Sequence, residues 1–351
     1  MYALIMAGGR GARFWPRSRR AFPKQCISIG GPDSLIRQTV DRLTPLVPPD
    51  RILVITGPDM VEAIAAQLPD LPPENILVEP RGRNTAPCVG WGAVEVARRG
   101  GENAVMMVLP ADHVITAPDV LLASLSAAAE AAVQTGALLT LGITPTHPET
   151  GFGYLELGDD AGQWGGQSIR VVQHFREKPD QATAAGYIAG GRHLWNAGMF
   201  VFTASAILRA FSEHLPRSAA ALSRIAADPS CLDAAWSELE ATSLDFGIME
   251  RAAHILTAPC DPGWSDVGSW GAAGAMLPEI PGGRGLAETV IGIDATDNII
   301  YVPGKVVALI GVSGLAVVDA DDALLVMDAR RAQDVRRIVS LLEDNGLERF
   351  T

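Results

Sequence analysis

The residues with the clearest chemical potential form a glycine-rich loop near the start of the chain. The loop reads Ala7-Gly8-Gly9-Arg10-Gly11-Ala12-Arg13 and follows a short apolar segment. Glycines let backbone N–H groups converge on phosphate oxygens without obstruction by side chains. Arg13 can grip a phosphate through its planar guanidinium, and Lys24 adds a point charge. The residues predicted to bind the phosphates of a nucleotide are Ala7, Gly8, Gly9, Gly11, Arg13 and Lys24. The alternative is a glycine turn with solvated arginines.

This loop matches neither of the two common nucleotide-binding fingerprints. A P-loop requires G-x-x-x-x-G-K-[ST], which is absent. A dinucleotide fingerprint requires a third glycine that opens a helix, but Phe14 stands there and Pro16 interrupts any helix. We therefore expect a nucleotide loop of a different type, and a dehydrogenase is only a distant alternative.

Two aspartates are candidate metal ligands. Asp112 lies in the segment LPADH, directly after an apolar run, and Asp266 lies in WSDVG. Mg²⁺ prefers oxygen ligands and usually takes one or two carboxylates together with substrate phosphates. On local sequence alone, a helix N-cap at Asp112 and a turn at Asp266 are equally good interpretations.

The elements that must position these residues alternate between short apolar runs and longer helical patterns. Such strands, covered on both faces by helices, predict an open, mainly parallel α/β sheet of Rossmann-like type, whose ligands bind beyond the carboxyl ends of the strands. The predicted strands are Tyr2–Met6, Arg51–Thr56, Asn75–Glu79, Val105–Leu109 and Leu138–Ile143. The predicted helices between them are Leu35–Leu43, Asp59–Leu68, Ala86–Arg99 and Val120–Thr135.

The remainder of the chain has a different pattern. We expect β structure around Ser168–Phe175 and Met199–Thr203, then helices at Ala204–Leu215 and Phe246–Ala253. A Pro/Gly-rich passage marks a domain boundary, which divides the chain into domains 1–285 and 286–351. Short apolar runs about nine residues apart follow the boundary and predict a small β module, closed by an amphipathic helix at Ala329–Asp344.

Composition limits the classes of partner. The chain is 48% apolar and 19% charged, with a net charge of −12. Such an acidic protein is a poor candidate for binding nucleic acid or an anionic membrane. The first 32 residues nevertheless carry six basic residues and no acid. We interpret this local excess as the site of a bound polyanion.

The cysteines and the apolar segments indicate the compartment. The four cysteines lie far apart without a Cys-x-x-Cys pair, which favours free thiols in a reducing cytosol. No basic region precedes the first apolar segment, so we predict no signal peptide. Polar residues interrupt the segment Val120–Ile143, which reads as a helix, a turn and a strand rather than a membrane span. We expect a soluble, cytoplasmic protein.

Longer motifs give the sequence a family resemblance. The segment GGRGARFWPRSRRAFPKQ resembles the signature of sugar-nucleotide pyrophosphorylases, specifically of bacterial mannose-1-phosphate guanylyltransferases. The resemblance continues through EPRGRNTAP (79–87), LPADHVI (109–115), TGFGYL (150–155), FREKPD (175–180), WNAGMF (195–200), SLDFGIMER (243–251), WSDVGSW (264–270) and DALLVMDARRAQDVRRIV (322–339). It implies a nucleotidyltransferase domain and a small β-helix-like C-terminal domain. The implied reaction converts GTP and mannose 1-phosphate to GDP-mannose and pyrophosphate with Mg²⁺, in a homodimer.

The same resemblance implies roles for individual residues. Asp112 and Asp266 match family positions associated with the metal, so we expect both to bind Mg²⁺, and Asp112 also to contact the nucleotide. Together with Arg13, Lys24 and Lys178 they form the expected catalytic set. Transfer to an anionic sugar phosphate needs alignment and charge neutralisation rather than a strong general base.

A sugar-phosphate site is implied by three further motifs. Lys178 resembles the family lysine that contacts the sugar phosphate, and Glu177 resembles the residue that accepts hydrogen bonds from sugar hydroxyls. Asn196 and Gly153 should complete this pocket, where the missing glycine side chain leaves room for the ring. Without the motifs, Glu177 and Lys178 would read as a solvated surface pair.

Base recognition has a candidate in Glu79. Guanine presents N1–H and N2–H₂ as donors on one edge, and a carboxylate can accept both. Glu79 lies at the end of the third predicted strand, and we expect it or a neighbouring backbone carbonyl to recognise guanine, with Asn84 and Thr85 shaping the pocket. The alternative is an ion pair between Glu79 and Arg81 or Arg83.

Some features depart from the family pattern. Phe14 and Arg17 stand where the family commonly has leucine, and Arg17 adds a charge with no evident partner in the sequence. Longer relatives carry a phosphomannose-isomerase domain, and we expect this chain to be the short form without it.

Two alternatives to the implied mannose-1-phosphate guanylyltransferase function stay open. One is a pyrophosphorylase for another pair of nucleotide and hexose 1-phosphate, and the other is a non-catalytic regulatory homologue.

Overall fold

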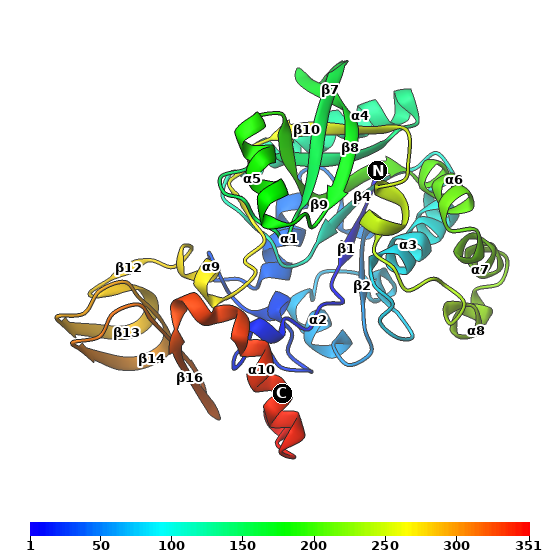
Figure 1. Ribbon diagram of the computed structural model, residues 1–351. Helices are drawn as coiled ribbons and strands as arrows, with labels where there is room; N and C mark the ends of the chain where they lie inside the picture. The colour runs from blue at the N-terminus through cyan, green and yellow to red at the C-terminus, as the bar shows by residue number, and fades with distance from the viewer.

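The computed structural model describes residues 1–351 and contains a large helix-covered sheet and a small β module at one end (Figure 1). The strands of the large sheet are β1 (Tyr2–Met6), β2 (Ile52–Thr56), β3 (Ile76–Val78), β4 (Val105–Pro110), β6 (Leu138–Ile143), β7 (Gly153–Trp164), β8 (Gln167–Glu177), β9 (His193–Thr203) and β10 (Ile255–Cys260). The helices are α1 (Leu35–Leu43), α2 (Val61–Gln67), α3 (Thr85–Gly100), α4 (Pro118–Thr135), α5 (Gln181–Gly190), α6 (Ala204–His214), α7 (Pro216–Ala227), α8 (Leu232–Trp236), α9 (Trp270–Gly274) and α10 (Val335–Asp344).

The large sheet confirms the predicted fold class. Its strand order is β3-β2-β1-β4-β9-β6-β10-β8-β7. The first four strands are parallel, whereas β9 runs antiparallel to both β4 and β6, so the sheet is mixed. Successive residues of β1 enter different cores, with Leu4 in one and Ala3 and Ile5 in the other. Burial on both faces explains why these strands are apolar throughout rather than alternating.

Parallel pairing brings three predicted segments to one edge of the sheet. The glycine-rich loop follows β1, Glu79 follows β3, and Asp112 follows β4. The register aligns Met6 with both Ile55 and Pro110, so these strands end at nearly the same level. We refer to this region as the carboxyl edge.

Two elements differ from the sequence-based expectation. The β7–β8 hairpin is much longer than the predicted run Ser168–Phe175, and polar or small residues along it obscure the alternation that identifies strands. The predicted helix Phe246–Ala253 is a single π-helical turn, Asp245–Met249. π-Helical turns are short and often occur at functional sites.

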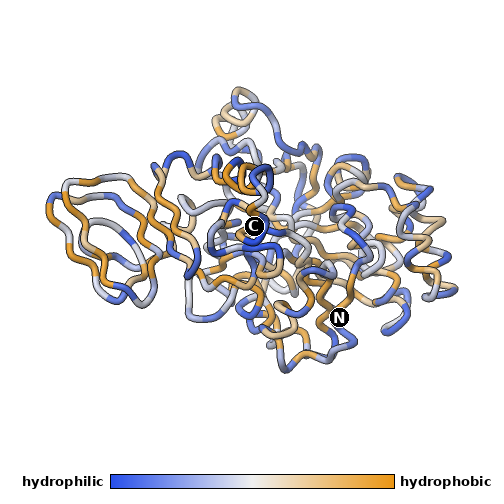
Figure 2. Tube along the Cα trace, turned by 90° about the horizontal axis from the view of Figure 1, so that it is seen from below, coloured by the Kyte–Doolittle hydropathy of each residue, from blue (hydrophilic) through white to orange (hydrophobic).

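The C-terminal module forms a second sheet with β-helix character. Its strands are β12 (Glu279–Ile280), β13 (Gly283–Ile293), β14 (Asn298–Ile310), β15 (Leu315–Ala320) and β16 (Ala323–Asp328). β13, β14 and β15 pair in parallel, whereas β12 and β16 pair antiparallel at the edges. Hydrophobic segments run along these strands (Figure 2). β14 joins two runs that the sequence separated, and α10 follows a 3-10 turn over residues 329–334.

The two parts of the chain share a core. Phe14 and Trp15 pack in one cluster with Trp270, Tyr301 and residues of α10. The predicted domain boundary after residue 285 stays a prediction, and β13 runs across it. None of the helices combines the length and the apolar character needed to span a bilayer.

Candidate functional site

The glycine-rich loop leaves β1 with its backbone exposed. Ala7 is anchored, since its N–H donates to Ile55 O (2.8 Å) and its carbonyl accepts from Gln25 Nε2 (2.7 Å). Gly8 and Gly9 are exposed. Gly11 has φ +68°, and a Cβ at this position would collide with Lys24 Cβ. The loop therefore requires glycine at residue 11 both for its backbone conformation and for the close approach of Lys24.

Lys24 connects the two candidate metal ligands. Its buried Nζ lies 2.9 Å from Asp112 Oδ2 and donates to the backbone oxygen of Asp266 (2.7 Å). The two-stranded pairing of β5 (Val114–Ile115) with β11 (Trp264–Ser265) brings these distant segments together. A single ammonium thus joins residues that are 154 positions apart in the sequence.

The two aspartates have different electrostatic environments. Burial favours a raised pKa at Asp112, but the charge of Lys24 and its hydrogen bond outweigh it and hold the pKa below its usual value. Burial raises the pKa of Asp266, and the charge of Asp112 raises it further against the opposing effect of Lys24. The charge of Asp112 thus disfavours ionisation of Asp266.

Arg13 lies on the other side of Asp266. Its Nη1 donates to Gly268 O (2.6 Å), and burial lowers the pKa of its guanidinium, with a further contribution from Arg336. The half-buried guanidinium is held by only one protein hydrogen bond. Arginine carries several N–H donors in a fixed fork, so further donors are available to a phosphate.

The donor set at this edge suits a hard divalent cation. Asp112 and Asp266 contribute carboxylate oxygens, and no group of three acidic, histidine or cysteine side chains forms a closed protein site. Mg²⁺ demands few protein ligands when substrate phosphates and water supply the others. The residues present therefore fit a cation that binds together with the nucleotide.

Glu79 is a buried carboxylate beside the loop. The residue is 6% exposed, and a Cβ on Gly8 would lie 3.3 Å from Glu79 Oε1. Burial raises its pKa to about 7. The alternative ion pair is absent, since neither Arg81 nor Arg83 lies within salt-bridge distance and Arg83 donates to Leu239 O instead (2.9 Å). The carboxylate is thus desolvated and available to a donor from outside the protein.

Asn84 and Thr85 begin α3 next to this carboxylate. Asn84 has φ +71° and caps the helix, because its Oδ1 accepts from Thr85 N (2.9 Å). Thr85 Oγ1 accepts from Leu244 N (2.9 Å). Through this contact, the start of α3 is tied to the π-helical turn on the other side of the site.

Strand register brings the predicted sugar residues together. Gly153 of β7 pairs with both Glu177 of β8 and Asn196 of β9. All three line a cavity of about 240 Å³, together with Thr85 and Asp266. A Cβ on Gly153 would lie 2.5 Å from Glu177 Oε2, so a larger residue would displace this carboxylate.

Glu177 is fixed by its neighbours but keeps one oxygen free. Its backbone N–H donates to Glu250 Oε1 (2.7 Å), and its Oε1 lies 2.5 Å from Lys178 Nζ. Oε2 is buried and has no hydrogen-bond partner. The ammonium of Lys178 is largely exposed, 5.9 Å from the ring of Phe246. This pair therefore combines an unpartnered acceptor with an exposed cation beside it.

Asp245 is a site residue to which the sequence analysis gave no role. It lines the same cavity, and its Oδ1 accepts from Asn196 Nδ2 (2.9 Å). Asn196 Oδ1 in turn accepts from Thr140 Oγ1 (2.7 Å), which fixes the orientation of the amide. Burial and the charge of Glu177 raise the pKa of Asp245 to about 6. The motif SLDFGIMER contained the signal, but it did not indicate that Asp245 faces Asn196.

His113 and Trp264 form a neutral pair at the cavity wall. Trp264 Nε1 donates to His113 Nδ1 (3.0 Å), and burial lowers the pKa of His113 to about 4. The histidine is therefore an uncharged acceptor near pH 7. Trp264 lines the cavity, whereas Trp15, Trp195 and Trp270 are buried as expected for packing residues.

The interpretation of the basic N-terminal segment as one polyanion site is wrong for three of its six bases. Arg17 lies over the ring of Tyr301, 5.3 Å from its centroid, which identifies its missing partner. Arg19 pairs with Asp322 (2.6 Å), and Arg20 pairs with Glu343 (3.1 Å). These bases therefore bind the C-terminal module. The sequence did not reveal this because the partners are about 300 residues away.

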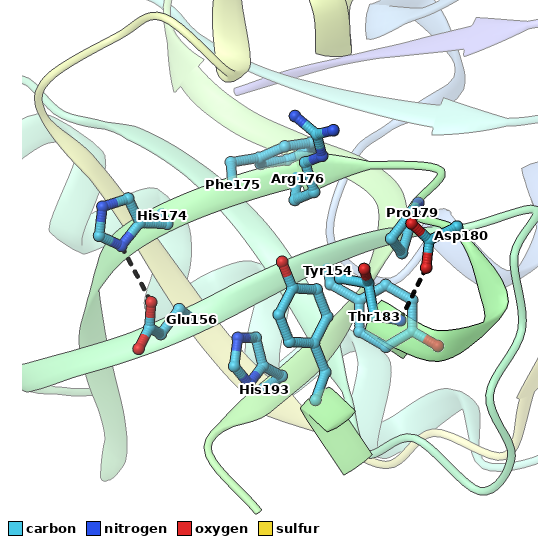
Figure 3. Close-up of a pocket in the computed structure, with 10 residues that line it drawn as sticks. Tyr154, Glu156, His174, Phe175, Arg176, Pro179, Asp180, Thr183 and His193 are labelled. Carbon is cyan, nitrogen blue, oxygen red and sulfur yellow. Dashed lines mark hydrogen bonds and ion pairs between the residues drawn. The ribbon is translucent and has the colours of Figure 1, made fainter. Parts of the chain in front are cut away.

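A second cavity, of about 420 Å³, lies among β7, β8, β9 and α5 (Figure 3). None of the sequence-predicted site residues lines it. His174 Nδ1 lies 2.9 Å from Glu156 Oε2, and Asp180 Oδ1 accepts from Thr183 N (2.8 Å). In the smaller cavity, by contrast, the predicted site residues Gly153, Glu177 and Asn196 come together, and Glu177 Oε2 has no hydrogen-bond partner. The candidate site is therefore at the carboxyl edge.

Comparisons with known proteins identify the family. The family model described as nucleotidyl transferase matches residues 2–277, and that described as MannoseP isomerase/GMP-like beta-helix domain matches residues 288–342. The xanthan biosynthesis protein XanB of Xanthomonas campestris pv. campestris strain B100 is 37% identical, over 99% of this chain and 74% of that protein. A mannose-1-phosphate guanylyltransferase of Escherichia coli K12 is 35% identical, over 99% of this chain and 74% of its own length.

A solved structure is similar along the whole length. It is described as a mannose-1-phosphate geranyltransferase from Thermus thermophilus. It superposes with a TM-score of 0.88 at 36% identity, and the match covers 97% of this chain and 99% of that one. The large sheet and the β module therefore have the same arrangement in both proteins.

Proposed function

The chain belongs to the nucleotidyl transferase family, and we propose that it is the enzyme that makes GDP-mannose and pyrophosphate from GTP and mannose 1-phosphate. The observation that carries the proposal is the contact of Lys24 with both Asp112 and Asp266 beside the glycine-rich loop. This contact joins the carboxylate of Asp112 and the backbone of Asp266 to a lysine whose side chain lies directly beside Gly11 of the loop. The arrangement suits the polyphosphate of a nucleoside triphosphate.

In the proposed reaction, a phosphate oxygen of mannose 1-phosphate attacks the α-phosphorus of GTP. The bond between the α-phosphorus and the oxygen that bridges to the β-phosphate breaks, and pyrophosphate leaves with that electron pair. Arg13 and Lys24 would neutralise the charge of the triphosphate, and Lys178 that of the sugar phosphate. Alignment of two bound anions supplies most of the catalysis in this kind of transfer.

Members of this family generally use a divalent cation. We propose that this chain uses Mg²⁺ and that Asp112 and Asp266 hold it. When bound with the nucleotide, Mg²⁺ supplies charge neutralisation on the phosphate oxygens. The two carboxylates approach from separate segments of the chain. Loss of either one would therefore remove half of the protein's contribution to the cation site.

We propose that Glu79 recognises guanine and that the cavity of Gly153, Glu177 and Asn196 holds the hexose. The free carboxylate of Glu79 matches the two donors on the edge of guanine. In the cavity, the unpartnered Oε2 of Glu177 and the carboxylate of Asp245 supply acceptors for sugar hydroxyls. These two groups are the basis for expecting a hydroxyl-rich ligand there.

A substrate matrix tests the proposed function. Pyrophosphate release would be measured with GTP, ATP, UTP and dTTP, each combined with mannose, glucose and fucose 1-phosphates. We expect the highest kcat/KM for GTP with mannose 1-phosphate. A preference for another pair would assign a different pyrophosphorylase activity. Binding of the nucleotide without release from any pair would favour a regulatory homologue.

We propose in addition that the enzyme is a homodimer, associated through the β module. Ile293 of β13 lies beside Ile310 of β14 in the parallel register, and Ile291 lies on the same outward face. The exposed fractions of Ile293, Ile310 and Ile291 are 57%, 70% and 57%. Such a contiguous apolar face is unusual on the surface of a monomer.

A further inference from the structure

Residues 15–20, which follow the glycine-rich loop, are hydrogen-bonded to the C-terminal residues of the chain. Trp15 Nε1 and Arg19 Nη1 both donate to one backbone oxygen, that of Phe350, at 2.7 and 2.8 Å. The backbone N–H of Arg20 donates to Thr351 O (3.1 Å). Phe350 belongs to a 3-10 turn at residues 348–350 that follows α10, and α10 lies alongside the N-terminal segment in Figure 1. We refer to residues 347–351 as the C-terminal turn.

Trp15 is also held by Trp270. Its backbone oxygen accepts from Trp270 Nε1 (3.1 Å), and the ring of Trp270 packs against that of Phe14 with centroids 5.0 Å apart. The guanidinium of Arg19 lies over the Trp15 ring, 5.6 Å from its centroid. Because Trp15 is only 7% exposed, its indole N–H has no access to abundant water if the contact with Phe350 is lost.

A short series of hydrogen bonds links Trp15 and Arg19 to the glycine-rich loop. Ser18 lies between Trp15 and Arg19, and its Oγ donates to Gly11 O (2.8 Å). Its N–H donates to Phe14 O (2.9 Å), which follows directly after Arg13. A displacement of residues 15–19 would therefore move both Gly11, whose left-handed conformation suits glycine, and the guanidinium that donates to Gly268 O.

We propose that the C-terminal turn, through its carbonyl contacts with Trp15 and Arg19, positions the glycine-rich loop for the nucleotide. Trp15 and Arg19 are then positioning residues, since neither lines the cavity of the candidate site. The inference rests on the proposed function only in naming GTP as the nucleotide.

The test compares Trp15→Phe and Arg19→Lys in the full chain with Arg20→Gln as a matched control. Trp15→Phe keeps an aromatic ring and removes the donor, and Arg19→Lys keeps the charge with an altered donor geometry. Arg20→Gln removes an exposed ion pair but leaves the backbone contact to Thr351. GTP affinity would be measured by fluorescence titration with Mg²⁺, along with thermal unfolding and the KM values for both substrates.

We expect Trp15→Phe and Arg19→Lys each to weaken GTP binding about fivefold, the usual range for the loss of one buried hydrogen bond. The KM for mannose 1-phosphate should remain unchanged, and Arg20→Gln should bind GTP like the wild type. Since both donors share one oxygen, the double variant should lose less than the product of the single effects.

Unchanged GTP affinity in both variants would overturn the inference, even if their unfolding temperatures fall. Equal increases in both KM values would also overturn it, because they would indicate a general structural defect. If Trp15→Phe fails to fold, the partly exposed Arg19 decides the question by itself. Wild-type protein that binds GTP but releases no pyrophosphate would refute the proposed function and leave this test intact.

Discussion

Glu79 is a buried carboxylate and Asp245 a half-buried one, and neither is paired with a cation. Each has a raised pKa, to about 7 and about 6, because burial disfavours the charged form. Glu79 faces the glycine-rich loop and Asp245 faces the sugar cavity. Buried carboxylates are costly unless a partner completes them, so these two positions indicate where substrate donors would bind.

The protonation state of Glu79 should control GTP binding. Only the ionised carboxylate accepts both donors of guanine, and its fraction rises with pH when the pKa is about 7. We predict that the KM for GTP falls about tenfold between about pH 6 and about pH 8. In Glu79→Gln this pH dependence of the KM should disappear, and the preference for GTP over ATP should decrease. The control variant Glu74→Gln, on the exposed 3-10 turn, should have the same KM and nucleotide preference as the wild type. An unchanged nucleotide preference in Glu79→Gln would exclude this residue as the one that reads guanine.

We expect Asp245 to affect the binding of the sugar phosphate but not that of GTP. In Asp245→Asn the charge disappears, and the hydrogen bond from Asn196 loses the strength that a carboxylate gives it. We predict that the KM for mannose 1-phosphate rises about tenfold, equivalent to about 1.4 kcal/mol, with little change in the KM for GTP. Initial-rate kinetics with each substrate varied in turn would measure both values. A rise confined to the KM for GTP would remove Asp245 from the sugar pocket.

Among the structural elements, the loop after β1 is the most sensitive to substitution. An alanine at Gly11 would occupy a left-handed conformation, which costs about 1–2 kcal/mol, and its Cβ would push against Lys24. We predict that Gly11→Ala lowers the free energy of unfolding by at least this amount and reduces kcat/KM, because Lys24 is displaced from Asp112. Denaturant unfolding would show the difference from Gly9→Ala, where a Cβ meets open space. Equal stabilities of the two variants would contradict this explanation.

Some of the structural elements could be predicted from local sequence patterns, and others could not. β1, β6 and α1 have the predicted boundaries, because continuous apolar runs and a 3.6-residue period depend on local sequence. The β7–β8 hairpin and the π-helical turn Asp245–Met249 were not predicted in full. Their conformations depend on contacts with β9 and α3, which no local pattern records.

The candidate site could likewise be predicted only in part from the sequence. Glu79 was predicted from its strand position and the donors of guanine, and Glu177 and Asn196 from the family resemblance; the structure places Glu177 and Asn196 in one cavity. The sequence did not indicate that Lys24 joins Asp112 to Asp266, because this contact depends on the pairing of β5 with β11. The family membership expected from the motifs is confirmed, while the roles of single residues stay predictions.

At the scale of the whole molecule, the β module has one side packed against the catalytic domain and one side exposed. Its inner side packs against the catalytic domain through Tyr301, whose hydroxyl donates to Ser28 O (3.2 Å). Its outer side carries the apolar face of Ile291, Ile293 and Ile310. A module that contacts the catalytic domain on one side and another subunit on the other would connect the two active sites of a dimer.

The dimer proposal predicts a change in mass on substitution of this face. Sedimentation equilibrium of the wild type should give twice the chain mass of 37.0 kDa. Ile310→Lys should give the monomer, because a buried unpaired charge would oppose association. Val133→Lys, at an exposed position of α4, is the matched control and should leave the dimer intact. A wild-type monomer at micromolar concentration would contradict the proposal.

The central claim is that Asp112 and Asp266 serve one cation at the glycine-rich loop. The most direct measurement is the rate of pyrophosphate release from GTP and mannose 1-phosphate by Asp112→Asn and Asp266→Asn, with thermal unfolding as the check on folding. We predict that each substitution lowers turnover by about two orders of magnitude or more, because each removes a carboxylate from the cation. A folded variant of either kind with a near-normal rate would contradict the claim.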